Sequence, residues 1–218
     1  MKPKIKIDVV SDVVCPWCYI GKRRLEKAVA ELSSQYDFDI EYHPFELNPT
    51  TPESGFNQKE YLTKKFGGED RYAELTNRVA GVAAEEGLIF DFSKQPVSPN
   101  TRKAHSLIQF ARGEGKQLAV KEAFMKAYFI DGIDLSKKEN VVDVAVQAGL
   151  VNEKVETVLA DENAPIQVAL AEQELSKLGI SSVPFYIINN KYGISGAQSP
   201  DTFIKAFHEI GQEINVSS

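Results

Sequence analysis

Alternating hydrophobic and polar residues at the start of the chain predict a strand. From Lys4 to Val10 the apolar positions are isoleucine and valine, which favour extended structure. Apolar residues between Leu25 and Leu32 then recur at helical spacing, and the segment from Phe38 to Leu47 again has strand composition. Pro44 favours an edge position or a bulge for this second strand. The order of strand, helix and strand predicts a parallel pair.

A long helical region follows a turn-rich linker, TTPESGFNQ, that begins at Thr50. From Lys59 to about Ala164 the apolar residues recur mainly at helical spacing, and no strand is expected there. Glycine, proline and aspartate residues separate the helices. The predicted helices are Tyr61–Phe66, Tyr72–Glu86, Thr101–Arg112, Leu118–Phe129, Lys137–Ala148 and Val151–Ala160.

Strand patterns return near the end of the chain. Pro165 to Leu178 predicts a helix, which Gly179 would close as a C-terminal cap. Phe185–Ile188 and Tyr192–Ser195 have strand composition on either side of an Asn-Asn-Lys turn, and they therefore predict a hairpin. Ser199-Pro200-Asp201 then has the order expected at a helix start, with a capping hydroxyl, a proline and an acid.

The two ends of the chain look like halves of one sheet. A parallel pair followed by an antiparallel hairpin makes a mixed sheet flanked by helices, which is an α/β fold. The helical region would interrupt this fold as an insertion. The expected boundaries are residues 1–50 for the first half, 51–164 for the insertion and 165–218 for the second half.

The composition is that of an ordinary globular protein and narrows the choice of partners. Hydrophobic residues make up 43% of the 218 residues, enough for a sizeable core. The net charge is −6 and the basic residues are dispersed, so nucleic acid is not an expected partner. The one basic cluster, Lys22-Arg23-Arg24, is expected to be a solvated helix face.

The chain also gives no reason to expect a membrane association. Its longest apolar runs, such as Val183–Ile188, are far shorter than the roughly 20 residues that span a bilayer. The N-terminus, MKPKIKIDVV, is basic but lacks the apolar stretch and cleavage site of a secretory signal. We therefore predict a cytoplasmic protein, and the sequence leaves its oligomeric state open.

Cys15 and Cys18 are the only cysteines, and they lie where the first strand meets the first helix. Two cysteines in a chain of this size make a structural disulfide framework implausible. A C-x-x-C motif beside a strand–helix–strand unit in a cytoplasmic protein is typical of thioredoxin-like redox proteins. We therefore interpret the pair as a redox-active dithiol or disulfide, and the α/β core as a thioredoxin-like fold.

The position of each cysteine predicts its role. Pro16 suits the first helical position, which places Cys15 at the helix N-terminus beside amides without a helical partner. A thiolate is stabilised there, so Cys15 is expected to be the exposed, attacking nucleophile. Cys18 lies one turn further on, close enough for a disulfide but deeper, and is expected to resolve the mixed disulfide.

A zinc site built on the two cysteines is the main alternative. Such a site would need two further ligands, and the three histidines, His43, His105 and His208, lie far apart along the chain. We therefore predict no metal and no organic cofactor for the exchange reaction.

Two further motifs accompany CPWC at 15–18: VPFYIINNKYGISGAQ at 183–198 and FELNP at 45–49. With the helical insertion, they make nearly the whole chain resemble the DsbA-like branch of the thioredoxin superfamily, and its FrnE-like cytosolic members in particular. The resemblance implies that the Val183–Pro184 bond is cis and faces the cysteines, with the Val183 backbone free to pair with a bound peptide. Taken alone, Pro184 would be an ordinary proline at the start of a strand.

Three other residues are candidates for substrate contact. Trp17, between the two cysteines, is expected to stay partly exposed and to offer an apolar contact. Asn100 and His105 lie at the start of a helix of the insertion, and similar segments in related proteins lie across the cleft from the active site. Both are therefore predicted to face the substrate, and a structurally hydrogen-bonded His105 is the alternative.

The sequence supports three functions, and a thiol–disulfide oxidoreductase is favoured. It would act on protein or small-molecule disulfides or dithiols, with glutathione as a candidate redox partner or co-substrate. A glutathione-dependent isomerase or transferase, like 2-hydroxychromene-2-carboxylate isomerase and the kappa-class transferases, is the second, although those relatives generally lack the cysteine found here at Cys18. A non-catalytic peptide-binding chaperone or redox sensor is the third. The direction of exchange depends on a reduction potential that a sequence does not contain.

Overall fold

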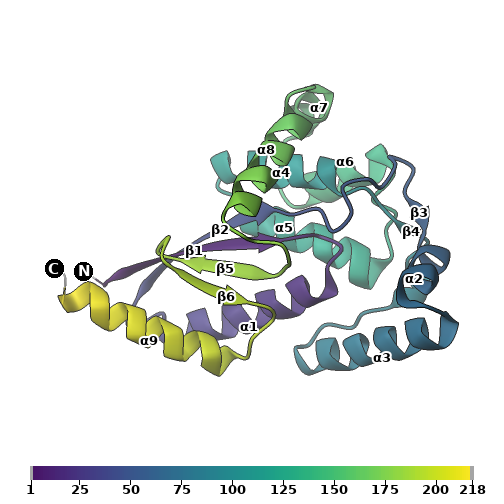
Figure 1. Cartoon of the computed structure of the whole chain (residues 1–218). Helices are drawn as coiled ribbons and strands as arrows, with labels where there is room; N and C mark the ends of the chain where they lie inside the picture. Colours follow the sequence, from purple (N-terminus) through teal and green to yellow (C-terminus); the bar gives the residue numbers. More distant parts are fainter. Residues whose placement is uncertain (1, 217–218) are drawn as a thin grey trace.

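The structure, a computed structural model, describes residues 2–216. Its centre is a mixed four-stranded sheet with the strand order β2-β1-β5-β6 (Figure 1). The strands are β1 (Lys4–Ser11), β2 (Asp37–Pro44), β5 (Phe185–Ile188) and β6 (Tyr192–Ser195). β1 is parallel to β2, whereas β5 is antiparallel to both β1 and β6. The predicted α/β class is therefore confirmed, and Pro44 ends the edge strand β2.

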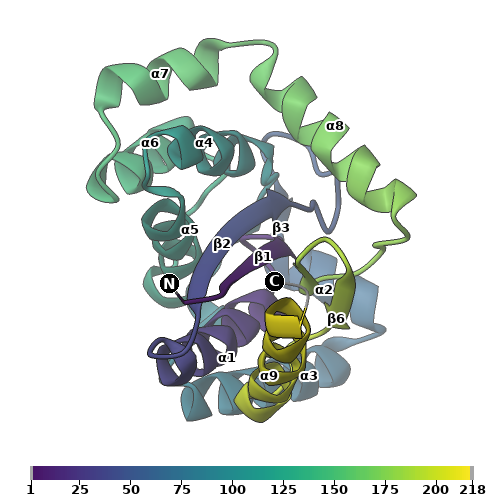
Figure 2. The ribbon, with the colours of Figure 1, turned by 90° about the vertical axis from the view of Figure 1, so that its left-hand side faces the viewer.

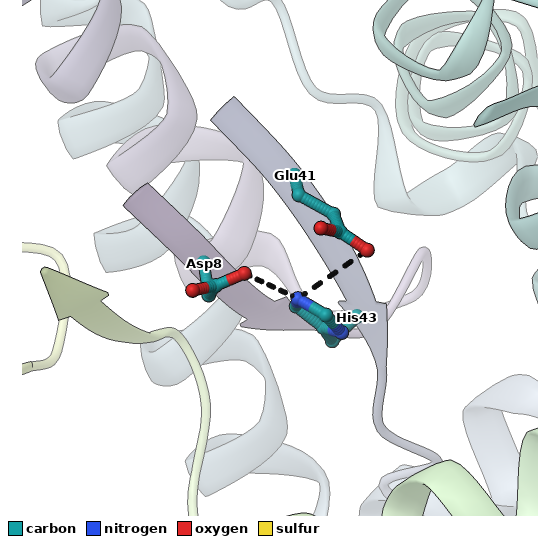
Figure 3. A group of neighbouring side chains, drawn as sticks. All are labelled: Asp8, Glu41 and His43. Carbon is teal, nitrogen blue, oxygen red and sulfur yellow. Dashed lines mark hydrogen bonds and ion pairs between the residues drawn. The ribbon is translucent and has the colours of Figure 1, made fainter. Parts of the chain in front are cut away.

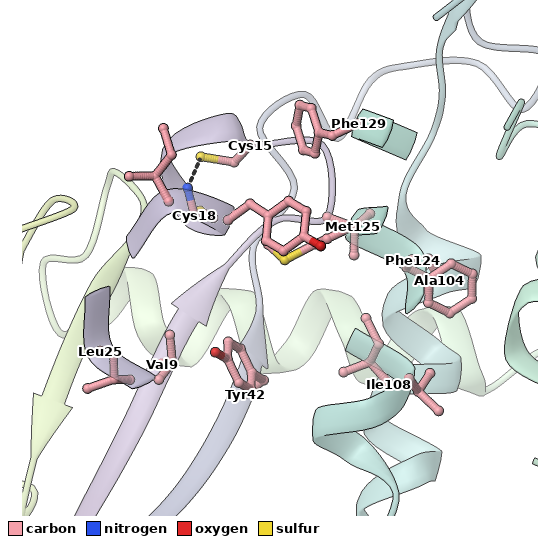
Figure 4. Close-up of a cluster of buried hydrophobic side chains, with 14 of the residues drawn as sticks. Val9, Cys15, Cys18, Leu25, Tyr42, Ala104, Ile108, Phe124, Met125 and Phe129 are labelled. Carbon is pink, nitrogen blue, oxygen red and sulfur yellow. Dashed lines mark hydrogen bonds between the residues drawn. The ribbon is translucent and has the colours of Figure 1, made fainter. Parts of the chain in front are cut away.

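Helices cover both faces of the sheet, so its central strand β1 is buried on both sides. Figure 2 shows α1 (Pro16–Leu32) and α9 (Pro200–Val216) on one side, and α4 (Arg102–Gly113) and α8 (Ala164–Lys177) on the other. Alternate strand residues point to opposite faces. Val9 therefore lies beside Leu25 of α1 (Figure 4), whereas Val10 packs with Leu175 of α8. The end of β1, directly before the cysteines, is therefore held by helices that pack on both faces of the sheet.

Helices between β2 and β5 form most of the remaining structure. Besides α4 and α8, they are α2 (Gln58–Phe66), α3 (Glu69–Glu85), α5 (Gln117–Lys126), α6 (Lys138–Gln147) and α7 (Asn152–Ala160), with a short 3₁₀ helix, η1 (Phe92–Lys94). The predicted helix from Leu118 to Phe129 is interrupted, because a π-helical turn, η2 (Ala127–Asp131), follows α5. No helix in residues 2–216 is long and apolar enough to cross a membrane.

The prediction of no strand after Lys59 is wrong for one short element. A second sheet consists of β3 (Phe56–Asn57) and β4 (Val97–Ser98), which are antiparallel. Each strand has two residues, too few for the alternation by which a strand is identified in a sequence. This small sheet joins the start of α2 to the segment before α4.

The basic cluster after the cysteines lies in an interface, which corrects the solvated face expected from the sequence. Lys22 is only 4% exposed and pairs with Glu122 of α5 at 2.5 Å. Arg23 also pairs with Glu122, and Arg24 pairs with Glu86, directly after α3. These ion pairs are partly buried, so each cation needs its carboxylate partner. The cluster therefore attaches α1, the helix that carries Cys18, to α3 and α5.

Candidate functional site

The two cysteines lie at the junction between β1 and α1. Cys15 is the N-cap residue of α1, and the backbone N–H of Cys18 donates to the Cys15 sulfur at 3.2 Å (Figure 4). No disulfide joins the two cysteines in this structure. An N–H donor at a helix N-terminus stabilises negative charge on the sulfur that it faces.

Cys15 is not the exposed residue that the sequence predicts, since only 4% of it is exposed. The Val183 carbonyl oxygen lies 3.9 Å from its sulfur, and Phe129 of the η2 turn lies nearby (Figure 4). The long insertion and the loop before β5 fold over the helix start, which a pattern of cysteine spacing could not show. Cys15 does line a partly open cavity, through which a substrate can reach it.

Cys18 differs from Cys15 in its surroundings. It is 2% exposed and is not among the residues that line the cavity. Burial raises the pKa of the Cys18 thiol well above its ordinary value, and the neighbouring Cys15 acts in the same direction. Cys18 is therefore held as a neutral thiol behind the sulfur that faces the cavity.

The loop before β5 lies against the cysteine helix. The Val183–Pro184 peptide bond is cis, and Val183 lines the same cavity as Cys15. Gly21 of α1 permits this close approach, because a β-carbon there would lie 3.3 Å from the Pro184 ring and 2.3 Å from the Tyr186 hydroxyl. The sequence motifs at 15–18 and 183–184 therefore meet in space.

A largely apolar cavity of about 370 Å³ opens beside Cys15. Pro16 and Trp17 line it together with Val183, and Trp17 is partly exposed as predicted. Hydrophobic side chains from the inserted helices form much of the remaining wall, among them Leu62, Phe66, Leu75, Val79, Phe92 and Phe129. Such a wall, mainly apolar with polar side chains between the hydrophobic ones, is typical of a site for small molecules or side chains.

A buried carboxylate, Asp12, lies close to the cysteines and was not identified from the sequence. It is 1% exposed; its Oδ1 atom lies 3.1 Å from Nε2 of His105, and its Oδ2 atom accepts from the Leu47 N–H at 2.8 Å. Burial alone raises the pKa of Asp12, but the hydrogen bond and charge of His105, the Leu47 N–H and the charge of Lys121 together outweigh it, so this pKa lies below its ordinary value. Asp12 thus joins the end of β1 to α4 and to the loop after β2.

Neither Asn100 nor His105 lines the cavity beside the cysteines, which corrects their predicted contact with substrate. His105 is 2% exposed and is directed at Asp12, so the alternative of a structurally hydrogen-bonded histidine holds. The Asn100 side chain donates to the Thr51 carbonyl at 2.8 Å and accepts from the Arg102 N–H at 2.9 Å. Both side chains therefore help to hold the start of α4 in place, and Asn100 lines a separate cavity.

Two neighbouring acidic residues, the buried Glu46 and the partly buried Glu172, lie where α8 meets the loop after β2. Glu46 pairs with Arg102 at 2.6 Å, and Glu172 of α8 interacts with Glu46. Within residues 2–216, neither Oε2 of Glu46 nor Oε1 of Glu172 has a hydrogen-bond partner. Burial raises the pKa of Glu172 to about 7, and the charge of Glu46 adds to this effect.

Replacing Glu172 with glutamine should make the protein more stable above neutral pH. The folded-state pKa is raised above the unfolded value of about 4.3, so the contribution of Glu172 to stability is lost as pH rises toward 7. We expect Glu172→Gln to raise the free energy of unfolding by about 1 kcal/mol at pH 8 and to change it little at pH 5. Urea denaturation at both pH values measures this. Glu174→Gln, at an exposed position of the same helix, is the control, and an equal pH dependence in all three proteins would contradict the prediction.

Asp8, Glu41 and His43 form another cluster, on β1 and β2 (Figure 3). Their ligand atoms lie within 4.8 Å of one another, and no other group of this kind occurs in residues 2–216. Lys6 pairs with Asp8 at 3.0 Å and Arg112 pairs with Glu41 at 2.5 Å, so two cations already balance the two carboxylates. The cysteines are not part of this group.

A comparison with protein families identifies the fold family. The family model of the DSBA-like thioredoxin domain matches residues 6–208. This chain belongs to the DsbA-like thioredoxin family. The predicted thioredoxin-like fold is therefore confirmed, and the expected FrnE-like branch is consistent with this membership.

Solved structures of DsbA-like proteins and their neighbours share the fold over nearly the whole chain. A probable DsbA oxidoreductase from Streptomyces coelicolor is 32% identical, with a TM-score of 0.86 over 94% of this chain and 89% of that one. A 2-hydroxychromene-2-carboxylate isomerase is 15% identical, with a TM-score of 0.71 over 98% of this chain and 99% of that one. The cytosolic disulfide reductase DsbM from Pseudomonas aeruginosa, in a structure with GSH, is 16% identical, with a TM-score of 0.62 over 95% of this chain and 99% of that one. The last two likenesses show the fold alone.

Proposed function

We propose that this DsbA-like protein is a thiol–disulfide oxidoreductase in which Cys15 attacks and Cys18 resolves. The observation that carries the proposal is the arrangement of two free thiols: Cys15 faces the cavity at the start of α1, and Cys18 is enclosed behind it. The Cys18 N–H, 3.2 Å from the Cys15 sulfur, stabilises charge on that sulfur as it attacks or leaves. A second thiol within reach is what disulfide exchange requires.

The reducing direction takes two exchange steps. The Cys15 thiolate attacks a substrate disulfide, forms a bond to one sulfur and displaces the other as a thiolate. Cys18 then loses its proton and attacks the Cys15 sulfur, which releases the second substrate thiolate and leaves a Cys15–Cys18 disulfide. The substrate gains two electrons and the protein loses two. Oxidation of a dithiol reverses these steps, and the direction depends on the reduction potential of the pair against that of its surroundings.

The lining of the cavity favours one class of substrate, namely peptide disulfides whose cysteines are flanked by apolar or aromatic residues. Its wall is mainly hydrophobic, and Trp17 lines it together with the attacking residue Cys15. The Val183 carbonyl, 3.9 Å from the Cys15 sulfur, is a backbone acceptor placed where a bound peptide strand would pass. Glutathione is a smaller candidate partner, as the DsbM structure with GSH suggests by its fold.

The decisive experiment is to trap the mixed disulfide in a Cys18→Ala variant. We expect this variant to form a stable adduct through Cys15 with insulin, and a separate one with glutathione disulfide, because no resolving thiol remains. Intact-mass spectrometry and peptide mapping identify the adduct, and dithiothreitol should release it. Comparison of the two substrates shows whether a peptide or glutathione is preferred.

A Cys15→Ala variant is the matched control for the trap. Its remaining Cys18 is enclosed and does not line the cavity, so we expect no adduct with either substrate. An adduct that forms only on Cys18, or no adduct on Cys15 with any disulfide, would overturn the proposed roles. Stoichiometric zinc in the purified protein would also count against them.

A further inference from the structure

Three polar side chains that line the Cys15 cavity have no part in the exchange steps above. They are Asn48, in the loop after β2, and Tyr61 and Lys65, one turn apart on α2. α2 packs against α3, β3 and β4, away from the central sheet (Figure 1). The Asn48 amide donates to the Tyr61 hydroxyl at 3.3 Å, and the Lys65 ammonium group donates to it at 3.5 Å. Asn48, Tyr61 and Lys65 therefore form one hydrogen-bonded group, the donor cluster.

The hydrogen bonds within the donor cluster leave only donors without a partner. The Asn48 side-chain oxygen accepts from the backbone N–H of Thr50 at 3.3 Å and from its hydroxyl at 2.7 Å, which turns the amide NH2 toward Tyr61. The Tyr61 oxygen accepts from both Asn48 and Lys65. Within residues 2–216, the Tyr61 hydroxyl hydrogen and the second amide hydrogen of Asn48 have no acceptor. A ligand at this cluster must therefore supply acceptors.

Lys65 gives the donor cluster a positive charge that no neighbouring side chain neutralises. Its ammonium group lies over the Tyr61 ring, 5.5 Å from the centre, and no carboxylate of residues 2–216 lies within 4.0 Å of it. The other charged side chain that lines the cavity, Asp12, is already bonded to His105 and Leu47. An unpaired cation beside an apolar cavity attracts a negatively charged group of a ligand.

The donor cluster lies beside an apolar wall and is held in place by it. The Tyr61 ring stacks on Phe56 of β3, with the ring centres 5.2 Å apart, so the position of its hydroxyl is fixed. Leu62 and Phe66, each next to a member of the cluster along α2, line the same cavity. The site therefore presents hydrogen-bond donors and one positive charge next to hydrophobic side chains, which fits a carboxylate attached to an apolar group.

We propose that the donor cluster binds a carboxylate of the substrate, and that the preferred substrates are disulfides in which an apolar or aromatic group carries this carboxylate. The inference rests on the proposed function and names the substrate class of the same site. A carboxylate has about four acceptor positions, enough for the free hydrogens of Asn48 and Tyr61 and for the Lys65 ammonium group. It stays outside the exchange itself, in which the Cys15 thiolate forms a bond to one substrate sulfur and displaces the other as a thiolate.

The test compares two aromatic disulfides that differ only in this group: dithiobis(nitrobenzoate), with a carboxylate on each ring, and dithiobis(nitrobenzamide), with an amide instead. The Cys18→Ala variant serves as the parent protein, so that only attack by Cys15 is observed. Stopped-flow absorbance of the released nitrothiophenolate gives the rate constant at pH 7. Each rate is divided by that of mercaptoethanol with the same probe, which removes the difference in intrinsic reactivity. We expect the parent to favour the carboxylate probe about tenfold.

Lys65→Met, made in this parent, should reduce the preference for the carboxylate probe by about fivefold, because the cation that pairs with the carboxylate is lost. Lys64→Met is the matched control. It removes the same charge from the adjacent position of α2, but Lys64 does not line the cavity, so the preference should be that of the parent. An equal loss in both variants would overturn the proposal, since the preference would then come from the overall charge of the helix.

Two further measurements test the contact itself. Tyr61→Phe removes one donor but keeps the ring that stacks on Phe56, and it should reduce the preference by about threefold. Added salt screens an exposed ion pair, so the preference of the parent should fall as sodium chloride is raised from 0.05 to 0.5 M, on the order of the change in Debye length. A preference that salt leaves unchanged would contradict the proposal without the use of any variant of α2.

A pair of blocked peptide disulfides identifies the source of the carboxylate. Both peptides carry a phenylalanine beside the cysteine, and they differ in one glutamate or glutamine. A preference for the glutamate peptide that Lys65→Met reduces assigns the donor cluster to acidic peptides. A preference confined to the nitrobenzoate probe assigns it to small carboxylate disulfides. The absence of a preference in both pairs would overturn the proposal.

Failure of this inference can be told from failure of the proposed function. If both aromatic probes modify Cys15 at equal corrected rates, the exchange mechanism stands and the donor cluster does not bind a carboxylate. If neither probe nor either peptide forms an adduct on Cys15, the exchange mechanism itself is wrong. Peptide mapping by mass spectrometry locates the adduct and so separates the two results.

Discussion

Replacing Cys15 with serine is expected to reduce disulfide turnover by at least about a thousandfold, because a hydroxyl group cannot replace a thiolate in disulfide exchange. The substitution is nearly isosteric, and the Cys18 N–H that donates to the Cys15 sulfur can donate to the serine oxygen instead. The fold should therefore be retained. Turnover is measured as the reduction of insulin with dithiothreitol as the electron donor, and as the reduction of glutathione disulfide.

The Cys15→Ser variant also distinguishes the three functions considered from the sequence. A peptide-binding chaperone would keep its binding and its suppression of aggregation without Cys15. A glutathione-dependent isomerase or transferase would depend on Cys15 but not on Cys18, so Cys18→Ser would keep its activity. An oxidoreductase should lose turnover in both variants while retaining its fold by circular dichroism. Full insulin reduction by Cys15→Ser would contradict the proposed function.

The elements of the fold could be predicted because their hydrophobic patterns are regular. The strand from Lys4 and the hairpin strands Phe185–Ile188 and Tyr192–Ser195 have bounds close to those expected. The π-helical turn Ala127–Asp131 could not be predicted, since its apolar residues continue the helical spacing of α5. The strand Val97–Ser98 was missed because two residues between prolines carry no alternation.

The sequence alone predicts those parts of the site that consist of short motifs of neighbouring residues. CPWC and Val183-Pro184 are short patterns, and the structure brings them together. The charges around them depend on long-range contacts, as between Asp12 and His105, 93 positions apart. Two signals were nevertheless present. Asp12 interrupts a run of valines, and Lys121 lies at helical spacing from the buried Met125, on the face of α5 that should be apolar.

Replacing Asp12 with alanine should destabilise the protein strongly, by more than the change expected for Glu172→Gln. The substitution leaves the buried His105 imidazole and the partly buried Leu47 N–H without the Asp12 oxygens, which lie 3.1 Å and 2.8 Å from them. Removing one partner of such a buried pair costs about 3–5 kcal/mol. We expect the free energy of unfolding, measured by urea denaturation at pH 7, to fall by this amount.

Asp12→Asn is the matched control, because asparagine has the same shape and keeps an oxygen for the Leu47 N–H, but it has no charge and places an NH2 group toward His105. The pKa of Asp12 is lowered in the folded protein, so the stabilisation from its charge is present above the unfolded value of about 3.9 and is lost as pH falls below it. The stability difference between the native chain and Asp12→Asn should therefore be constant from pH 5 to 7 and shrink below about pH 4. A difference that does not change with pH would show that Asp12 acts by shape alone. The charge would then not be what holds α4 and the loop after β2 against the cysteines.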